Sequence, residues 1–399
     1  MRSFVDTSIQ AEIDVLKKSG LYRNLKKIAG PIGTTVSIDG KEVILLSSNN
    51  YLGLATHPRL IDAAASVMKR YGTGACASRL IAGNMEIHEE LEERIATFKG
   101  CQSAILFSTG YMANIGLISS LAREGDLILS DELNHASIID GCRLSRAEVK
   151  VYRHKDVKEL RNILMNTDLC VSHSKHKRKF IITDGIFSMD GDITPLPEIL
   201  NIAKEHDTFV IIDDAHATGV LGKKGMGTVE YFGVRDDRII HMGTFSKALG
   251  SLGGYIAGSK AVIEYLKNKA RSFVYSTALP PGVCAASIAA IEMLEKEPWI
   301  HEELWKNVGR LKRGLRDLGY DTLGSQTQII PILIGDTTLT MEFAKAILEK
   351  GVYAPGIRPP TVSEGTSRIR TSVMASHTEE QIDKVLNVFK DEGRRLRII

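Results

Sequence analysis

The sequence predicts an α/β fold built on a mostly parallel β-sheet that helices cover on both faces. Short apolar runs rich in Ile, Val and Phe, each bounded by Gly, Asp or Ser, alternate with amphipathic helical segments through the middle of the chain. Strands that are apolar along their whole length and are joined by helices are typical of a parallel sheet buried on both sides.

Six apolar runs are predicted to be strands: 104–107, 127–129, 180–183, 209–212, 239–242 and 254–257. Two helices between them are clear from their patterns. In 85–98, the residues Ile87, Leu91, Ile95 and Phe98 recur on one helical face, and 197–206 has a proline near its start.

The pattern changes after Pro280 and Pro281. The predicted elements are then helices at 282–296 and 301–318, a strand at 329–334, a helix at 339–350, a strand at 368–373 and a helix at 378–395. The N-terminal segment 1–46 contains an amphipathic helix and a hairpin that turns at Asp39 and Gly40. We therefore divide the chain into this segment, which is expected to pack on the rest or on a second subunit, a large domain (47–281) and a smaller α+β domain (282–399).

Composition narrows the class of protein. The 399 residues include 51 Lys and Arg against 48 Asp and Glu, a balance that gives no reason to expect a nucleic acid or an anionic membrane as partner. No apolar stretch is long enough to span a membrane. The five cysteines are odd in number, widely spaced and without a CxxC pair, which favours a reduced cytoplasmic enzyme over a disulfide scaffold or zinc site. The basic run at 172–179 is predicted to be a solvated loop.

Polar residues follow several predicted strands, and ligands collect at the carboxyl ends of strands in open α/β sheets. Lys247 lies among small and hydroxylated residues after strand 239–242; such a lysine can form a Schiff base with an aldehyde, although a solvated surface lysine also fits. Asp213 and His216 follow strand 209–212. The acid could keep a heteroaromatic ring nitrogen protonated, or it could simply cap the strand.

Two further signals are weaker. The stretch 107–114 passes from a strand through small residues into a helix, whose first N–H groups could bind a phosphate. His135 follows strand 127–129, where it could cap a helix or serve a site. The histidines at 135, 216 and 241 lack the spacing of metal ligands, so no metal site is predicted. The glycines at 72–77 follow a helix rather than a strand, which argues against a dinucleotide site.

Together these segments resemble the α-oxoamine synthases, a family of fold-type I pyridoxal-phosphate enzymes, over essentially the whole chain. The likeness rests on SSNNYLGL (47–54), YGTGACASRL (71–80), DELNHASIIDG (131–141), DGIFSMDGD (184–192), DDAHATGVLG (213–222) and GTFSKALGSLGGY (243–255). It implies an aminotransferase-like large domain with a seven-stranded sheet, a smaller C-terminal domain, bound pyridoxal 5′-phosphate, and condensation of an amino acid with an acyl thioester with loss of carbon dioxide.

The resemblance also implies roles. Lys247 would form the Schiff base, Asp213 would pair with the ring nitrogen, His216 and Ser188 would contact the ring's phenolic oxygen, and His135 would stack on the cofactor. The remaining implied residues bind phosphate or substrate: Thr244, Gly110 and Tyr111 for the phosphate, Ser276 and Thr277 for the phosphate of the neighbouring subunit in a homodimer, and Arg370, Asn49 and Arg23 for the substrates.

The branch of the family is indicated by residues 356–370, GIRPPTVSEGTSRIR. They resemble the signature of the branch that condenses L-alanine with a pimeloyl thioester for biotin synthesis, with Ser363 in place of the usual proline. Against this, NNYLGL and LNHASIIDG resemble at least as closely the branch that condenses glycine with acetyl-CoA. A serine palmitoyltransferase-like activity is a third alternative. The thioester carrier, coenzyme A or acyl-carrier protein, stays open.

Overall fold

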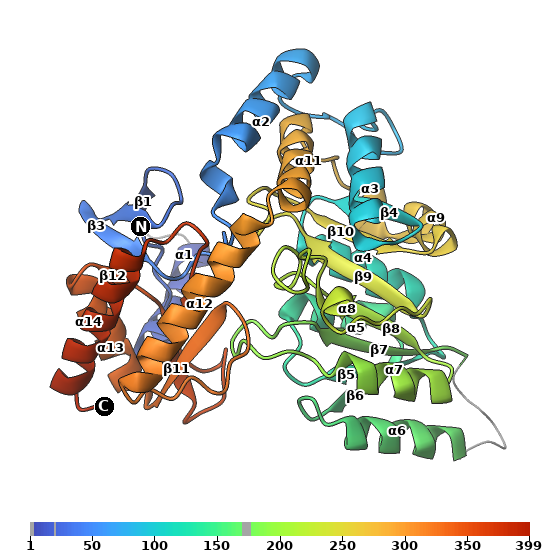
Figure 1. Ribbon diagram of the computed structural model, residues 1–399. Helices are drawn as coiled ribbons and strands as arrows, with labels where there is room; N and C mark the ends of the chain where they lie inside the picture. The colour runs from blue at the N-terminus through green and yellow to red at the C-terminus, as the bar shows by residue number, and fades with distance from the viewer. Residues whose placement is uncertain (1–3, 20, 170–176) are drawn as a thin grey trace.

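A seven-stranded sheet forms the centre of the larger part of the molecule (Figure 1). The computed structural model describes residues 4–19, 21–169 and 177–399. The strands lie in the order β4 (Ser103–Phe107), β10 (Gly254–Gly258), β9 (Ile239–Thr244), β8 (Phe209–Asp213), β7 (Lys179–Asp184), β5 (Leu127–Asp131) and β6 (Glu148–Tyr152). Only β10 runs antiparallel to its neighbours, so the mostly parallel sheet is confirmed.

All six strands predicted from their apolar runs are present in the structure. The seventh strand of the sheet, β6, was not predicted. This strand pairs on one side only, with β5, and its alternate residues Val149 and Val151 are 38% and 60% exposed. Because charged residues interrupt its sequence, EVKVY, it has no continuous apolar run. An edge strand of this kind does not give the signal of a strand buried on both faces.

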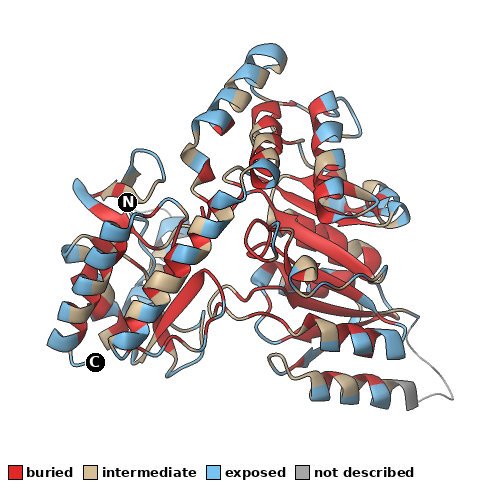
Figure 2. Cartoon of the chain, viewed as in Figure 1, coloured by how far each residue is buried: buried red, intermediate tan, exposed pale blue. Residues whose placement is uncertain are grey.

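Helices cover both faces of the sheet, and the strands supply alternate side chains to each layer. Ile211 packs with α4 on one face, whereas Val210 and Ile212 pack with α6 and α7 on the other. In Figure 2 the strands are buried along their length and the helices mainly on their inner sides. The helices of this part are α2 (Pro58–Tyr71), α3 (Glu86–Lys99), α4 (Gly110–Leu121), α5 (Ala136–Ser145), α6 (Val157–Leu169), α7 (Leu196–Glu205), α8 (Thr228–Tyr231), α9 (Lys260–Lys269), α10 (Arg271–Val274) and the short 3₁₀ helix η1 (Leu54–Thr56).

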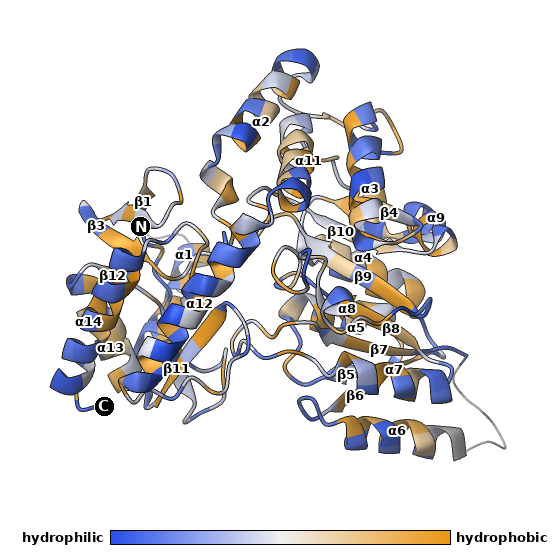
Figure 3. Cartoon of the chain, viewed as in Figure 1, coloured by the Kyte–Doolittle hydropathy of each residue, from blue (hydrophilic) through white to orange (hydrophobic). Residues whose placement is uncertain are grey.

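The predicted C-terminal elements are confirmed to within two residues at each end. The helices are α11 (Pro281–Lys296), α12 (Trp299–Asp317), α13 (Thr337–Glu349) and α14 (Glu379–Arg395), and a three-stranded sheet holds β11 (Ile329–Gly335), β14 (Ser367–Ser372) and β13 (Gly356–Ile357). Figure 3 shows polar residues on the outer sides of α12 and α14. Among the described helices, none is long and apolar enough to cross a bilayer.

The N-terminal segment packs beside the C-terminal elements (Figure 1). It contains α1 (Phe4–Lys18), β1 (Ile28–Ala29) and the predicted hairpin β2 (Thr35–Ile38) and β3 (Lys41–Leu45). β3 pairs in parallel with β12 (Val352–Tyr353), so the hairpin shares a sheet with the C-terminal part. The three-part division of the chain at residues 46/47 and 281/282 stays a prediction.

The sheet brings the ends of distant strands together. Asp184 at the end of β7 is paired with Asp213 at the end of β8, and Asp213 with Met242 of β9. Gly254 of β10 lies between Thr244 and the end of β4. A Cβ on Gly254 would lie 2.7 Å from the Cα of Gly110, so its missing side chain lets the start of α4 approach the sheet.

Candidate active site

A cavity of about 200 Å³ lies at the carboxyl ends of the strands. Eight of the residues predicted from the sequence line it: Gly110, Tyr111, His135, Ser188, Asp213, His216, Thr244 and Lys247. Asn114, Ser137, Asp184, Ala215, Met242 and Ser246 complete the wall. A larger surface hollow between α6 and α7, of about 380 Å³, gathers none of these residues.

Asp213, the last residue of β8, and Asp214, which follows it, have different surroundings. Asp213 lines the cavity, where its carboxylate accepts hydrogen bonds from Asn114 Nδ2 at 2.7 Å and the Ala215 amide at 2.8 Å. Asp214 Oδ2 lies 2.7 Å from Lys99 Nζ in an ion pair that is almost completely buried. Asp214 is not among the residues that line the cavity. Only Asp213 therefore offers its carboxylate to the cavity.

Lys247 and Asp184 give the cavity its unusual electrostatics. Burial lowers the pKa of Lys247 to about 8, and although Asp213 and Asp184 oppose this change, Arg370 adds to it. No hydrogen bond or ion pair joins Lys247 Nζ to the described residues. Burial raises the pKa of Asp184 well above its ordinary value, and the charge of Asp213 acts in the same direction. Near neutral pH, Asp184 thus holds a proton more readily than an ordinary aspartate does.

The start of α4 suits an anion. Thr109 caps the helix by accepting a hydrogen bond from the Met112 amide at 3.1 Å. The amides of Gly110 and Tyr111 in the first turn have no partner inside a helix. Thr244, across the cavity, is held by a 2.6 Å hydrogen bond from its hydroxyl to the Gly253 carbonyl. The helix N-terminus and the amides together favour a phosphate.

The backbone of His135 is fixed at the end of β7. Its backbone amide donates to Asp184 Oδ2 at 2.8 Å. The preceding Asn134 donates to the Ile182 carbonyl at 2.8 Å and accepts from the Asp184 amide at 3.0 Å. His135 is also the N-cap of α5. The two alternatives for this histidine are therefore compatible, because the capping residue itself lines the cavity.

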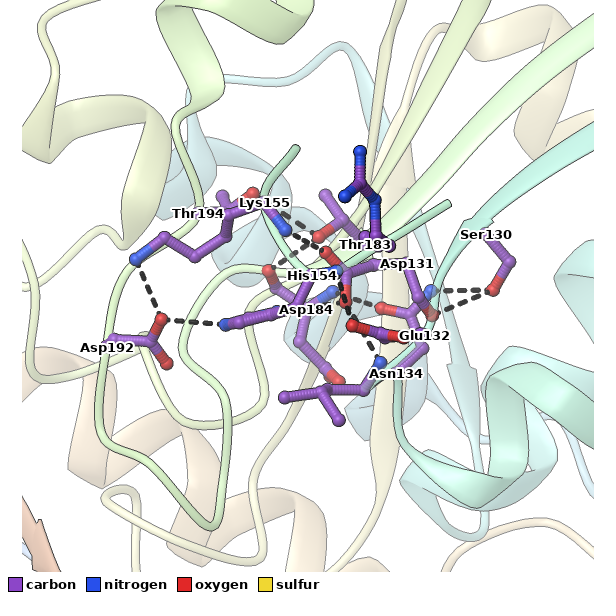
Figure 4. Close-up of polar contacts among 12 residues, drawn as sticks. Ser130, Asp131, Glu132, Asn134, His154, Lys155, Thr183, Asp184, Asp192 and Thr194 are labelled. Atoms are coloured by element: carbon purple, nitrogen blue, oxygen red, sulfur yellow. Dashed lines mark hydrogen bonds and ion pairs between the residues drawn. The ribbon is translucent and has the colours of Figure 1, made fainter. Parts of the chain in front are cut away.

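A charged network supports the loop that carries Ser188 (Figure 4). The ring of His154 lies between Asp131 and Asp192, with N–O distances of 3.0 and 2.9 Å, and packs edge-on against Phe187. Lys155 Nζ adds an ion pair to Asp192 at 2.7 Å. The network ties the end of β5 to the loop after β7.

Arg370 and Asn49 lie behind the cavity wall. The buried Arg370 donates from Nε to the Ser188 carbonyl at 2.6 Å and from Nη2 to Asn49 Oδ1 at 3.3 Å. Asn49 in turn contacts the hydroxyl of Tyr51, which contacts His216. The substrate role of Arg370 and Asn49 stays a prediction, supported by this connection to the wall.

Three further residues predicted for the site, Ser276, Thr277 and Arg23, lie outside the cavity. Ser276 and Thr277 line a small separate cavity, where the Thr277 carbonyl accepts a hydrogen bond from Ser108. Arg23 is exposed, and no contact among the described residues joins it to the cavity. A site shared between subunits is compatible with the first two positions, and the role of Arg23 stays a prediction.

Sequence reasoning did not single out Tyr51, Asn114, Asp184 or Ser246. Each lies within a segment already quoted, but nothing local distinguishes it from its neighbours. Asn114 bonds Asp213, 99 positions away, and Tyr51 bonds His216, 165 positions away. Only the folded chain reveals such pairs.

The donor set fits pyridoxal phosphate. A Cβ on Gly110 would lie 3.1 Å from Met242 Cε and 3.6 Å from Thr244 Cβ, so the glycine keeps open the space beside the free amides of α4. Asn114 Oδ1 is buried without a hydrogen-bond partner in the cavity wall. Anion-binding amides, a carboxylate for a ring nitrogen and a lysine with a lowered pKa are the groups that this cofactor requires.

Comparisons with known proteins agree with this site. The model of the family "aminotransferase class I and II" matches residues 41–389. The 8-amino-7-oxononanoate synthase of Thermoanaerobacter pseudethanolicus is 48% identical over 391 residues, 98% of either protein. SPT (serine palmitoyltransferase) with a PLP internal aldimine superposes with a TM-score of 0.92 at 33% identity, over 100% of both chains. The 8-amino-7-oxononanoate synthase of Francisella tularensis gives 0.74 at 27% identity, over 88% of this chain and 98% of its own.

The His154 network predicts a pH-dependent stability. Burial opposes the charge on His154, but hydrogen bonds to Asp131 and Asp192 and their charges raise its pKa from 6.5 to about 9. The stabilisation is therefore complete below pH 6.5 and is lost as the pH rises through about 9. It amounts to at most about 3 kcal/mol. Urea unfolding of the cofactor-free chain between about pH 6 and pH 10 should show this loss.

The matched variant is His154→Gln, which keeps a polar side chain but cannot take up the proton. Its free energy of unfolding should lack this component of the pH dependence and should lie below that of the unsubstituted chain at the acidic end. Equal pH dependence in the two proteins would exclude His154 as the source.

Proposed function

The chain belongs to the class I and II aminotransferase family and, within it, to the α-oxoamine synthases, and from this premise we propose that it makes 8-amino-7-oxononanoate. The reaction condenses L-alanine with a pimeloyl thioester and releases carbon dioxide and the free thiol, a step of biotin synthesis. The observation that carries the proposal is 48% identity to a named synthase over 98% of both chains.

Different cavity residues would bind different parts of the cofactor. The amides of Gly110 and Tyr111, with Thr244, would hold the phosphate, and Asp213 would pair with the ring nitrogen. When bound, pyridoxal phosphate supplies an aldehyde that captures the substrate amine and a protonated ring that accepts the electron pair left on Cα. Two neutral hydrogen-bond donors already hold the Asp213 carboxylate, from Asn114 and Ala215, so it is oriented before the cofactor arrives.

Lys247 is suited to move the substrate proton. When its Nζ is free and neutral, it would take the proton from the substrate Cα as a general base. A pKa of about 8 leaves a substantial neutral fraction near physiological pH, which an ordinary lysine lacks. Arg370 and Asn49 would hold the amino-acid carboxylate, since a guanidinium fork binds carboxylate in two places.

The acyl half of the reaction needs a donor near the thioester. His135, at the N-terminus of α5, could hydrogen-bond the thioester carbonyl oxygen as the carbon–carbon bond forms and the thiol leaves. The β-keto acid that results loses carbon dioxide because its ketone accepts the electron pair. His135 would then keep that oxygen in place.

A serine palmitoyltransferase-like activity is the second candidate, because the TM-score to an SPT structure is 0.92. Overall shape is common to the whole family, however, and identity to this structure is 33% against 48% for the synthase. Substrate choice depends on side chains rather than on the path of the backbone. Sequence identity therefore favours the alanine-dependent reaction.

The substrate assignment is tested by thiol release from purified holoenzyme. Alanine, glycine and serine are each paired with pimeloyl, acetyl and palmitoyl thioesters, and the product is identified by mass. We expect alanine with the pimeloyl thioester to give the highest kcat/KM. Lys247→Ala is the matched blank, since it lacks the base. A preference for glycine with acetyl-CoA, or for serine with palmitoyl-CoA, would reassign the chain to another branch.

We also propose a homodimer that works in the cytoplasm. Leu80, Ile81 and Tyr275 are large apolar residues that are 56%, 83% and 73% exposed in the single chain, and a second copy would cover them. Ser276 and Thr277 follow Tyr275 directly, so such an interface would also bring them toward a partner. The four described cysteines are free, in keeping with a reducing compartment.

Hybrid dimers test whether the site is shared. Lys247→Ala and Thr277→Ala chains are each purified, mixed under conditions that exchange subunits, and assayed. If Thr277 serves the partner's cavity, one site of each hybrid has both native residues and activity should rise above that of either parent. Lys247→Ala mixed with Asp213→Asn is the control, because both changes lie in one cavity. Equal behaviour of the two mixtures would mean that Thr277 acts within its own chain.

A further inference from the structure

We propose that Tyr51 is a positioning residue that holds His216 in the tautomer with its proton on Nδ1, so that His216 offers the cavity a lone pair on Nε2. The hydrogen-bonding inference depends on contacts within this chain. Its consequence for rate rests on the function proposed above.

The argument begins at Arg370, whose side chain can only donate hydrogen bonds. Its Nη2 lies 3.3 Å from Asn49 Oδ1, and this fixes the Asn49 amide with its oxygen toward Arg370. The same oxygen lies 3.0 Å from the hydroxyl of Tyr51. An amide oxygen cannot donate, so the single proton of the phenol must point to Asn49.

The direction of the next hydrogen bond follows. The Tyr51 hydroxyl lies 2.7 Å from His216 Nδ1, and its own proton is already used. Nδ1 must therefore carry a proton and donate it to the phenol oxygen. Burial raises the pKa of the fully buried Tyr51, although the charge of Arg370 and hydrogen bonds from Arg370 and Gln328 oppose this, and the phenol keeps its proton.

His216 is neutral, so its second ring nitrogen bears a lone pair. Burial lowers its pKa well below the ordinary value, and the charges of Lys247 and Arg370 act in the same direction. The ring lines the cavity, and Nε2 has no hydrogen-bond partner among the described residues. Gln328 fixes the backbone by donating to the His216 carbonyl at 3.0 Å. Nε2 is therefore an acceptor for a protonated group in the cavity.

The other cavity histidine is held in the opposite tautomer. Asn114 Nδ2 donates to Ser137 Oγ at 2.8 Å, and Ser137 Oγ lies 2.8 Å from His135 Nδ1. The Ser137 amide also donates to His135 Nδ1 at 3.3 Å. With Nδ1 an acceptor, neutral His135 carries its proton on Nε2. The cavity thus has one histidine that donates and one that accepts, and only the second depends on Tyr51.

Tyr51→Phe removes the phenol oxygen and leaves the rest of the ring. Without its acceptor, Nδ1–H of His216 is buried and unpaired, so the neutral ring no longer favours one tautomer. Arg370 and Gln328 lose a hydrogen bond to the phenol oxygen, but Arg370 and Asn49 keep the contact with each other. We therefore expect kcat to fall about 10- to 100-fold, the range for losing a group that orients a functional histidine, while KM for alanine changes little.

Neutron diffraction from the deuterated full chain, with and without pyridoxal phosphate, tests the tautomer directly. We expect deuterium on Nδ1 of His216, on Nε2 of His135, and on the Tyr51 hydroxyl directed toward Asn49. In Tyr51→Phe, His135 should be unchanged and His216 should show deuterium shared between its nitrogens or moved to Nε2. Deuterium on His216 Nε2 in the unsubstituted protein would overturn the proposal.

Two variants separate positioning from general loss of stability. Tyr255→Phe removes another fully buried phenol, whose oxygen lies 2.7 Å from Thr218 Oγ1, away from the cavity residues; it should leave the His216 tautomer and kcat unchanged. Asn49→Asp keeps an acceptor for Tyr51, so the tautomer should persist. The new carboxylate would compete for Arg370, and KM for alanine should rise. Loss of the tautomer in either variant would contradict the assigned chain of hydrogen bonds.

Failure of this inference and failure of the proposed function are distinguishable. The cofactor-free diffraction measurement does not depend on which substrates the enzyme uses. If the tautomers are as assigned but alanine and pimeloyl thioester do not react, the proposed function is wrong and the role of Tyr51 stands. If the reaction occurs and His216 carries its proton on Nε2, the proposed function stands and the role assigned to Tyr51 is wrong.

Discussion

The chemistry of this molecule depends on two buried lysines, each beside an aspartate at the end of β8. Asp214 is in direct contact with Lys99, and despite the burial, which opposes its charge, the pKa of that lysine is raised by the aspartate. Lys247 faces Asp213 in the cavity without a direct ion pair, and burial lowers its pKa to about 8. The same two residue types thus give a permanent ion pair on one side and a titratable amine on the other.

The difference follows from how each pair is satisfied. Thr228 donates to Asp214, and Lys99 also bonds the Met226 carbonyl, so the charges of the structural pair are compensated. Breaking such a buried pair costs about 3–5 kcal/mol, which fixes the end of the strand. On the cavity side, Asn114 and Ala215 hold Asp213 with neutral donors. Its charge remains available to a ligand, and the rigid strand end keeps it in position.

Much of this arrangement could be predicted from the sequence because a strand buried on both faces is visible there as a continuous apolar run. The apolar runs located six strands, and the residues at their ends, Asp213 and Lys247 among them, meet because parallel strands share one edge. The edge strand β6 lacks an apolar run and was missed. Tyr51 and Asn114 could not be found because their partners are distant in the chain and any polar residue could occupy such positions. The role proposed for Ser276 and Thr277 requires a second subunit, which one sequence does not display.

The titratable amine is the central claim, and its pKa can be measured directly. Trace acetylation of the cofactor-free chain over a range of pH, with peptides quantified by mass spectrometry, reports the neutral fraction of each lysine. We predict half-maximal labelling of Lys247 near pH 8, with Lys99, whose side chain is 1% exposed, unlabelled over the same range. Labelling of Lys247 that rises only near the ordinary lysine pKa of 10.5, or in parallel with Lys99, would contradict the account.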